Sequence, residues 1–110
     1  MNIQKTEKYT LIKPSQNSVN QFITEFKKIH SNFEKEHLII DFSDKINFDI
    51  KEILLFLDVS ALHYQKNNSF VIVCNGIDFN DVPENINVVP TLVEAIDIIE
   101  MEAIERDLGF

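Results

Sequence analysis

The sequence has 110 residues, a formal net charge of −8 at pH 7, a hydrophobic fraction of 45% and a charged fraction of 25%. This length suits a single domain, residues 1–110, and the composition is that of a globular protein rather than a disordered one. Apolar runs are only a few residues long and the N-terminus lacks the apolar segment of a secretory signal, so we expect a soluble cytoplasmic protein without membrane association.

The charge is unevenly distributed along the chain. The nine Lys and nine Asp or Glu residues of positions 1–66 cancel, and the whole −8 falls in residues 67–110, where Arg106 stands against nine acids. Such a surface repels phosphate backbones, so we expect no nucleic-acid binding. The acids either bind a basic protein partner or simply keep a helix face solvated.

The first part of the chain is expected to form a hairpin and a helix. Residues 2–6 and 9–13 have the composition of two short strands, and Pro14, which lacks a backbone N–H, ends the second. Ser18 and Gln21 have the spacing of a helix N-terminal capping box. Apolar residues then recur at helical intervals to about His30, which predicts a helix over residues 19–30.

The segment 37–64 predicts a buried strand followed by a long helix. Leu38 to Ile40 form a continuous apolar run closed by Asp41, which is typical of a strand covered on both faces. Asp49 and Glu52 have capping-box spacing, so the helix should begin at Ile50 and extend to about residue 66.

This helix has more apolar residues than one buried face requires. At 100° per residue, one stripe is expected to cover the sheet: Ile50, Ile53, Leu54, Leu57, Ala61 and Tyr64. A second stripe of Leu55, Val59 and Leu62 lies on nearly the opposite face. Either another element of the chain covers this second stripe or a partner does, and we predict partner binding by Asp49, Ile50, Leu55, Val59 and Leu62.

The last part of the chain predicts two further strands and a helix. Residues 69–74 are apolar and follow the helix, which indicates a parallel, right-handed βαβ unit. Residues 86–89 form another strand ended by Pro90, and Thr91 with Glu94 begins a helix that Gly109 should end. The fold class is therefore α/β, with a mixed sheet of four to five strands and helices packed against it.

Motifs for catalysis and cofactor binding are lacking. Two glycines in the chain exclude a glycine-rich phosphate loop. His30, His37 and His63 fall in three separate elements, so we interpret them as surface or satisfied histidines rather than metal ligands. Cys74 is interpreted as a small buried hydrophobe. We expect no cofactor and no enzyme activity.

One acidic cluster leaves an alternative open. Asp41, Asp44 and Asp49 follow the end of a strand, where α/β proteins usually place their sites, and could hold Mg²⁺ weakly. The simpler interpretation makes Asp44 a turn residue and Asp49 a helix cap. The alternative function is a small metal-assisted hydrolase or a ribonuclease accessory that uses these carboxylates.

From about Tyr9 onwards, the order of elements and the segment LIIDFSDKINFDIKEILLFL resemble the STAS domains, the family of anti-sigma factor antagonists and of the cytoplasmic tails of sulfate transporters. In that family a buried strand ends in Asp, a second Asp follows eight residues later, and the next residue is a serine that the partner kinase phosphorylates. Asp41 and Asp49 match both acids. The ending VVPTLVEAIDII also resembles the last strand and helix of the family.

The departures from the family affect what the resemblance implies. Ile50 occupies the serine position, Glu52 replaces a usual glycine, and the segment between the last two strands is shorter than the family's helix. The resemblance implies a small STAS-like mixed sheet used as a non-catalytic protein-interaction or regulatory module without the serine switch. The implied partner is a protein, such as an anti-sigma factor-like kinase, or a second copy in a homodimer.

Overall fold

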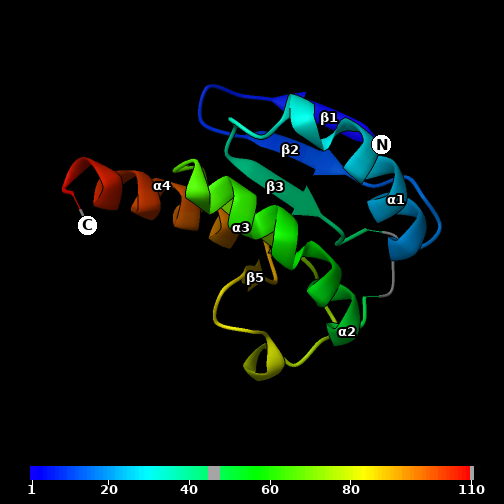
Figure 1. The fold of residues 1–110 in the computed structure, drawn as a ribbon. Coiled ribbons are helices and arrows are strands. Elements are labelled where there is room, and N and C mark those ends of the chain that lie inside the picture. Colours follow the sequence, from blue (N-terminus) through cyan, green and yellow to red (C-terminus); the bar gives the residue numbers. More distant parts are fainter. Residues whose placement is uncertain (45–47, 110) are drawn as a thin grey trace.

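The computed structural model describes residues 1–44 and 48–109, and in these residues five short strands form one mixed sheet (Figure 1). The strands are adjacent in chain order, and β1 pairs antiparallel with β2 while the other neighbours pair parallel. Their bounds are β1 (Asn2–Lys5), β2 (Thr10–Lys13), β3 (Leu38–Asp41), β4 (Phe70–Val73) and β5 (Asn87–Val89).

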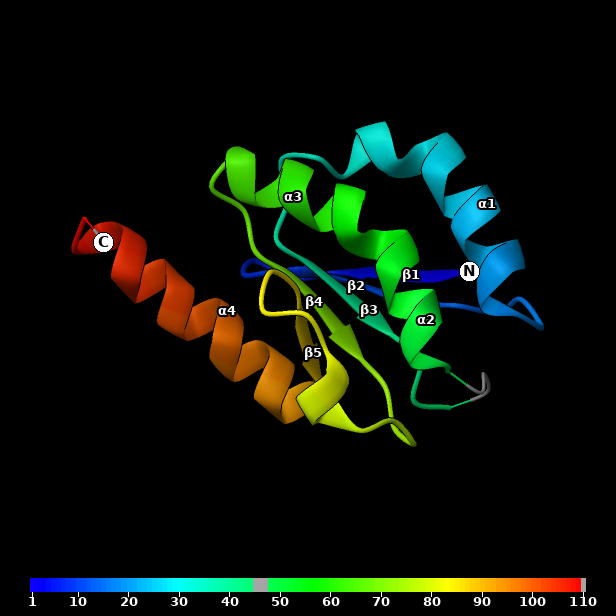
Figure 2. The ribbon, with the colours of Figure 1, turned by 60° about the horizontal axis from the view of Figure 1, so that its bottom comes forward.

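Helices cover both faces of this sheet. One face carries α1 (Val19–Ile29) with the 3₁₀ turn η1 (His30–Asn32), and beside them α2 (Ile50–Ile53), the 3₁₀ turn η2 (Leu54–Phe56) and α3 (Leu57–Gln65). The opposite face carries α4 (Leu92–Asp107) (Figure 2). A short 3₁₀ turn, η3 (Phe79–Asp81), lies between β4 and β5. The predicted α/β class is confirmed.

Local signals place the helix ends as expected. Ser18 Oγ accepts a hydrogen bond from the Gln21 N–H at 3.1 Å, and Thr91 Oγ1 accepts one from the Glu94 N–H at 3.2 Å. These side chains satisfy backbone donors that the first helical turn leaves free. Gly109, with φ of 81°, follows α4 in the left-handed geometry that glycine tolerates best.

The larger core lies between the sheet and the α1–α3 side. Phenylalanine rings contribute much of it, with centroid separations of 5.4 Å for Phe22–Phe42 and 4.7 Å for Phe42–Phe48. Phe56 and Phe70 pack in the same cluster, and both are 0% exposed. Cys74 is fully buried here, as expected, and burial raises its pKa to about 11.

A smaller core joins α4 to the other face of the sheet. It consists mainly of Leu11, Ile39, Val71, Val73, Ala95 and Ile99. The C-terminal turns of α4 extend past the edge of the sheet (Figure 1). Among the residues that the structure describes, no helix combines the length and apolarity needed to cross a bilayer.

Candidate docking surface

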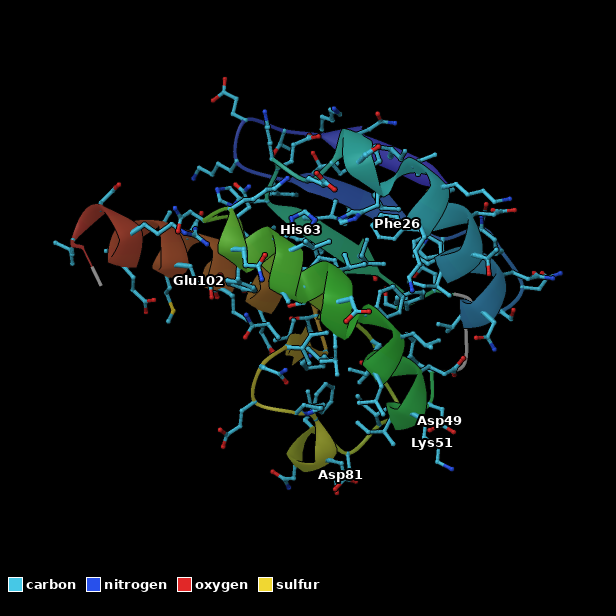
Figure 3. The ribbon with its side chains drawn as sticks, in the orientation of Figure 1. Phe26, Asp49, Lys51, His63, Asp81 and Glu102 are labelled. Atoms are coloured by element: carbon cyan, nitrogen blue, oxygen red, sulfur yellow. The ribbon has the colours of Figure 1, made fainter. Side chains whose placement is uncertain are left out.

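The N-terminus of α2 is held by the capping box that the sequence predicts. Asp49 Oδ1 accepts a hydrogen bond from the Lys51 N–H at 3.0 Å, and Glu52 Oε1 accepts one from the Asp49 N–H at 3.0 Å. Asp49 and Lys51 lie together at the start of α2 (Figure 3). Ile50, the first helical residue, is half-buried against the larger core. The Asp49 carboxylate therefore has a structural role, whatever else it contacts.

The predicted helix over residues 50–66 exists, but its buried face differs from the prediction. Val59, predicted on the outer stripe, is 3% exposed and packs in the larger core. Leu54 and Ala61, predicted to be buried, are exposed. The cause is η2, because a 3₁₀ turn has three residues per turn instead of 3.6 and rotates the residues that follow it. The face that meets the sheet carries Ile53, Phe56, Val59, Ser60 and His63.

Two residues of the predicted second stripe do face outwards. Leu55 and Leu62 are 37% and 39% exposed, and Leu54 is 52% exposed. Leu54 and Leu55 lie in η2, and Leu62, seven residues after Leu55, lies about two turns further along the same side. The observed apolar surface therefore consists of Leu54, Leu55 and Leu62, which we call the leucine face; it gains Leu54, which was predicted to be buried, and loses Val59.

A shallow depression adjoins the start of α2. Its volume is about 570 Å³, and it lies where β4 leaves the sheet, next to η3. Its lining combines apolar and acidic side chains: Phe48, Asp49, Ile50, Glu52, Ile77, Asp78 and Asp81. Asp81, the last residue of η3, lies near the Asp49 end of α2 (Figure 3). This end of the molecule presents negative charge to any partner.

The three carboxylates of the metal alternative do not converge. Asp41 and Asp44 line a separate depression of about 250 Å³ at the ends of β2 and β3, and Asp49 does not. Lys13 lies in the same depression, with Nζ 3.8 Å from Asp44 Oδ2. Asp41, 7% exposed, accepts a hydrogen bond from the Ser43 N–H at 2.9 Å. Within residues 1–44 and 48–109, no group of three His, Cys, Asp or Glu residues is placed to hold a metal ion.

Two of the histidines form a buried pair that sequence spacing did not reveal. His30 Nε2 and His63 Nε2 are 2.9 Å apart, and His63 Nδ1 lies 3.0 Å from the carbonyl oxygen of Glu36. Because a carbonyl only accepts, His63 carries its proton on Nδ1 and accepts the Nε2–H of His30. Burial, together with the smaller effect of the neighbouring His30, lowers the pKa of His63 from 6.5 to about 4, although the hydrogen bond to Glu36 opposes the shift.

A polar network joins the C-terminal half of α4 to the α3–β4 connection. The Tyr64 hydroxyl donates to the Glu102 carboxylate at 2.9 Å, and the Ser69 hydroxyl donates to Glu102 Oε1 at 2.6 Å. Arg106 Nη2 donates to Ser69 Oγ at 3.1 Å, and Asn87 Nδ2 donates to the Tyr64 hydroxyl at 2.6 Å. Burial and the Glu102 charge raise the pKa of Tyr64, so this network keeps its phenol protonated.

A scan of the sequence against models of known protein families finds no match, and a search of curated protein sequences finds no significant match. The STAS resemblance therefore rests on the motifs quoted above and on the order of the elements.

Sequence reasoning missed both polar clusters because they assemble residues far apart in the chain. His30 and His63 are 33 positions apart, and Ser69 and Arg106 are 37 apart. A weak signal existed for His63, which stands in the apolar run Ala61 to Tyr64, since a histidine within an apolar run is usually buried and then requires a hydrogen-bond partner. That signal predicts a partner but not its identity.

Proposed function

We propose that this protein is a non-catalytic protein-interaction or regulatory module of the STAS type, which docks through the leucine face and the adjoining start of α2. The observation that carries the proposal is the exposure of Leu54, Leu55 and Leu62 on one helix. Large apolar side chains that gather on a surface usually mark a contact with another protein.

The neighbouring residues support the same surface. The Asp49 end of α2 and its acidic depression lie at one end of the leucine face, so a partner would meet an apolar patch with a negative border. Apolar contacts of this kind contribute about 1.5 to 3 kcal/mol for each fully buried side chain, before the cost of ordering the partners. Two or three leucines would contribute a few kcal/mol in this way, which is enough to matter for a micromolar contact with a protein partner or with a second copy.

The proposed module lacks the family's serine switch. Ile50 occupies the position that the resemblance assigns to the phosphorylated serine, and isoleucine has no hydroxyl to phosphorylate. We expect incubation with an anti-sigma factor-like serine kinase and ATP to leave the protein's mass unchanged. A phosphate found by mass spectrometry on nearby Ser43 or Ser60 would show that a displaced switch exists.

The leucine face is tested by charge insertion. Leu55→Asp and Leu62→Asp should leave the fold intact, because both side chains are more than one third exposed, yet abolish self-association or capture of a partner. Circular dichroism measures the fold, and light scattering measures self-association. Asn20→Asp, at an exposed position of α1 outside the leucine face, adds the same single negative charge and is the control.

Two outcomes would contradict the proposal. If both leucine variants unfold, these side chains belong to the core. If they fold and associate exactly as the unmodified protein does, the leucine face is not a docking surface.

A further inference from the structure

The outer face of α4 carries a second apolar surface, on the opposite side of the sheet from the leucine face. Four large side chains are among the most exposed hydrophobic residues of the chain: Val93 at 69%, Met101 at 58%, Ile104 at 59% and Leu108 at 66%. At 100° per residue they fall within an arc of about 80°, so they form one straight stripe. We call these four residues the α4 outer stripe.

The stripe is as long as a partner helix would need. Val93 and Leu108 are separated by 15 helical steps, about 22 Å or four turns at 1.5 Å per residue. A groove of about 360 Å³ continues the stripe towards the turn between β1 and β2, where Ile99, Ala103 and Ile104 line it together with His37. The helix therefore presents an apolar track, which Asp97 interrupts between Val93 and Met101, with a hollow beside it.

Acidic residues border this track on both sides. In helical projection Glu100 and Asp107 flank one side, Glu94 and Glu105 flank the other, and Asp97 lies within the stripe. Glu100 is paired with Lys8 at 3.2 Å. The one basic residue of positions 67–110, Arg106, is half-buried against Ser69 on the inner side of α4.

We propose that the α4 outer stripe docks a basic amphipathic helix of a protein partner. The charge decides between occupants: a second copy would bring two acidic borders together, and nucleic acids or anionic lipids would be repelled in the same way. A helix with an apolar face and Lys or Arg flanks complements both the stripe and its borders, and it packs along a straight helix of equal length. This surface is independent of the leucine face, so the module would hold two partners at once.

The test uses a synthetic, fluorescently labelled amphipathic helix of Leu and Lys, about 16 residues long to match the stripe. We expect micromolar binding by anisotropy. Met101→Ser and Ile104→Ser, which leave the net charge at −8, should each weaken it by about tenfold or more, as central contacts do. The control is Leu55→Ser, which removes an exposed leucine from the other face and should bind the peptide as tightly as the unmodified protein.

A companion peptide with Glu in place of Lys tests the charge argument, and we expect it not to bind. In a spectrum of ¹⁵N-labelled protein, the Leu and Lys peptide should shift amide signals of residues 93–108. Equal binding by the Ile104→Ser variant, shifts confined to residues 50–66, or equal binding of the Glu peptide would overturn the proposal. A dimer seen by sedimentation that Ile104→Ser dissolves would also overturn it, because the occupant would then be a second copy.

Discussion

Lowering the pH should destabilise this protein through the buried His30–His63 pair. The pair depends on one neutral arrangement, in which His63 donates through Nδ1 to the Glu36 carbonyl and accepts at Nε2 from His30. A proton added to His63 Nε2 would place two N–H groups against each other at 2.9 Å. Burial lowers the pKa of both histidines. For His30, the nearby charge of Glu34 favours protonation, and that of Lys66 opposes it.

The size of the effect follows from the pKa of His63. In the unfolded chain the imidazole binds a proton near pH 6.5, whereas in the folded protein its pKa is lowered to about 4. Between these values the unfolded state binds more protons, so the free energy of unfolding decreases as the pH falls from 6.5 to 4. This shift corresponds to about 3 kcal/mol at most, and we expect about 2 kcal/mol because local opening rehydrates the charged ring.

Urea denaturation at pH 7 and at pH 4.5 measures this loss. Carboxylates also titrate in acid, so the His63→Gln variant serves as the reference. It should be less stable than the unmodified protein at pH 7. Between pH 7 and pH 4.5, its free energy of unfolding should decrease by about 2 kcal/mol less than that of the unmodified protein. The same pH dependence in both proteins would refute the reasoning, as would an NMR titration that places the pKa of His63 near 6.5.

Three further outcomes follow from the site. Val59→Ala should lower the free energy of unfolding by about 2 kcal/mol, because Val59 is only 3% exposed. Leu62→Ala should lower it by less than about 1 kcal/mol, because Leu62 is 39% exposed; urea unfolding of the two variants measures both losses. Asp49→Ala should cost about 1 kcal/mol through the lost helix cap, and equal unfolding midpoints would contradict that role. Isothermal calorimetry with millimolar Mg²⁺ should give no saturable heat, because Lys13 already lies beside Asp44; a saturable signal that Asp44→Ala removes would revive the metal alternative.

The fold was predictable because its signals are local. Caps at Ser18, Asp49 and Thr91 act within three residues, and the apolar runs of β3 and β4 indicate burial on both faces without knowledge of their neighbours. Sheet order then follows from short connections and right-handed crossovers.

The surface was less predictable because it depends on helix phase. The extrapolation from Ile50 at 100° per residue failed beyond η2, where a single 3₁₀ turn brought Phe56 and Val59 to the core. In α4 the acids were expected to bind a basic partner or to keep a helix face solvated, and the exposed apolar residues among them were not predicted. Because α4 is a regular helix, its outer apolar residues follow the 100° periodicity and could have been read from the sequence.

Because Cys74 is buried, the reactivity of its thiol can report the opening of the central sheet. Its thiol is 0% exposed, and its backbone N–H donates to the Val89 carbonyl at 3.0 Å, so reagent access requires the separation of β4 from β5 and of the helices above them. The thiolate that reacts with alkylating reagents is scarce at a pKa of about 11 and becomes more abundant by about two orders of magnitude after opening restores a value near 8.5. The alkylation rate in native buffer, measured against that of the unfolded chain, would thus give the free energy of opening of the central sheet without denaturant.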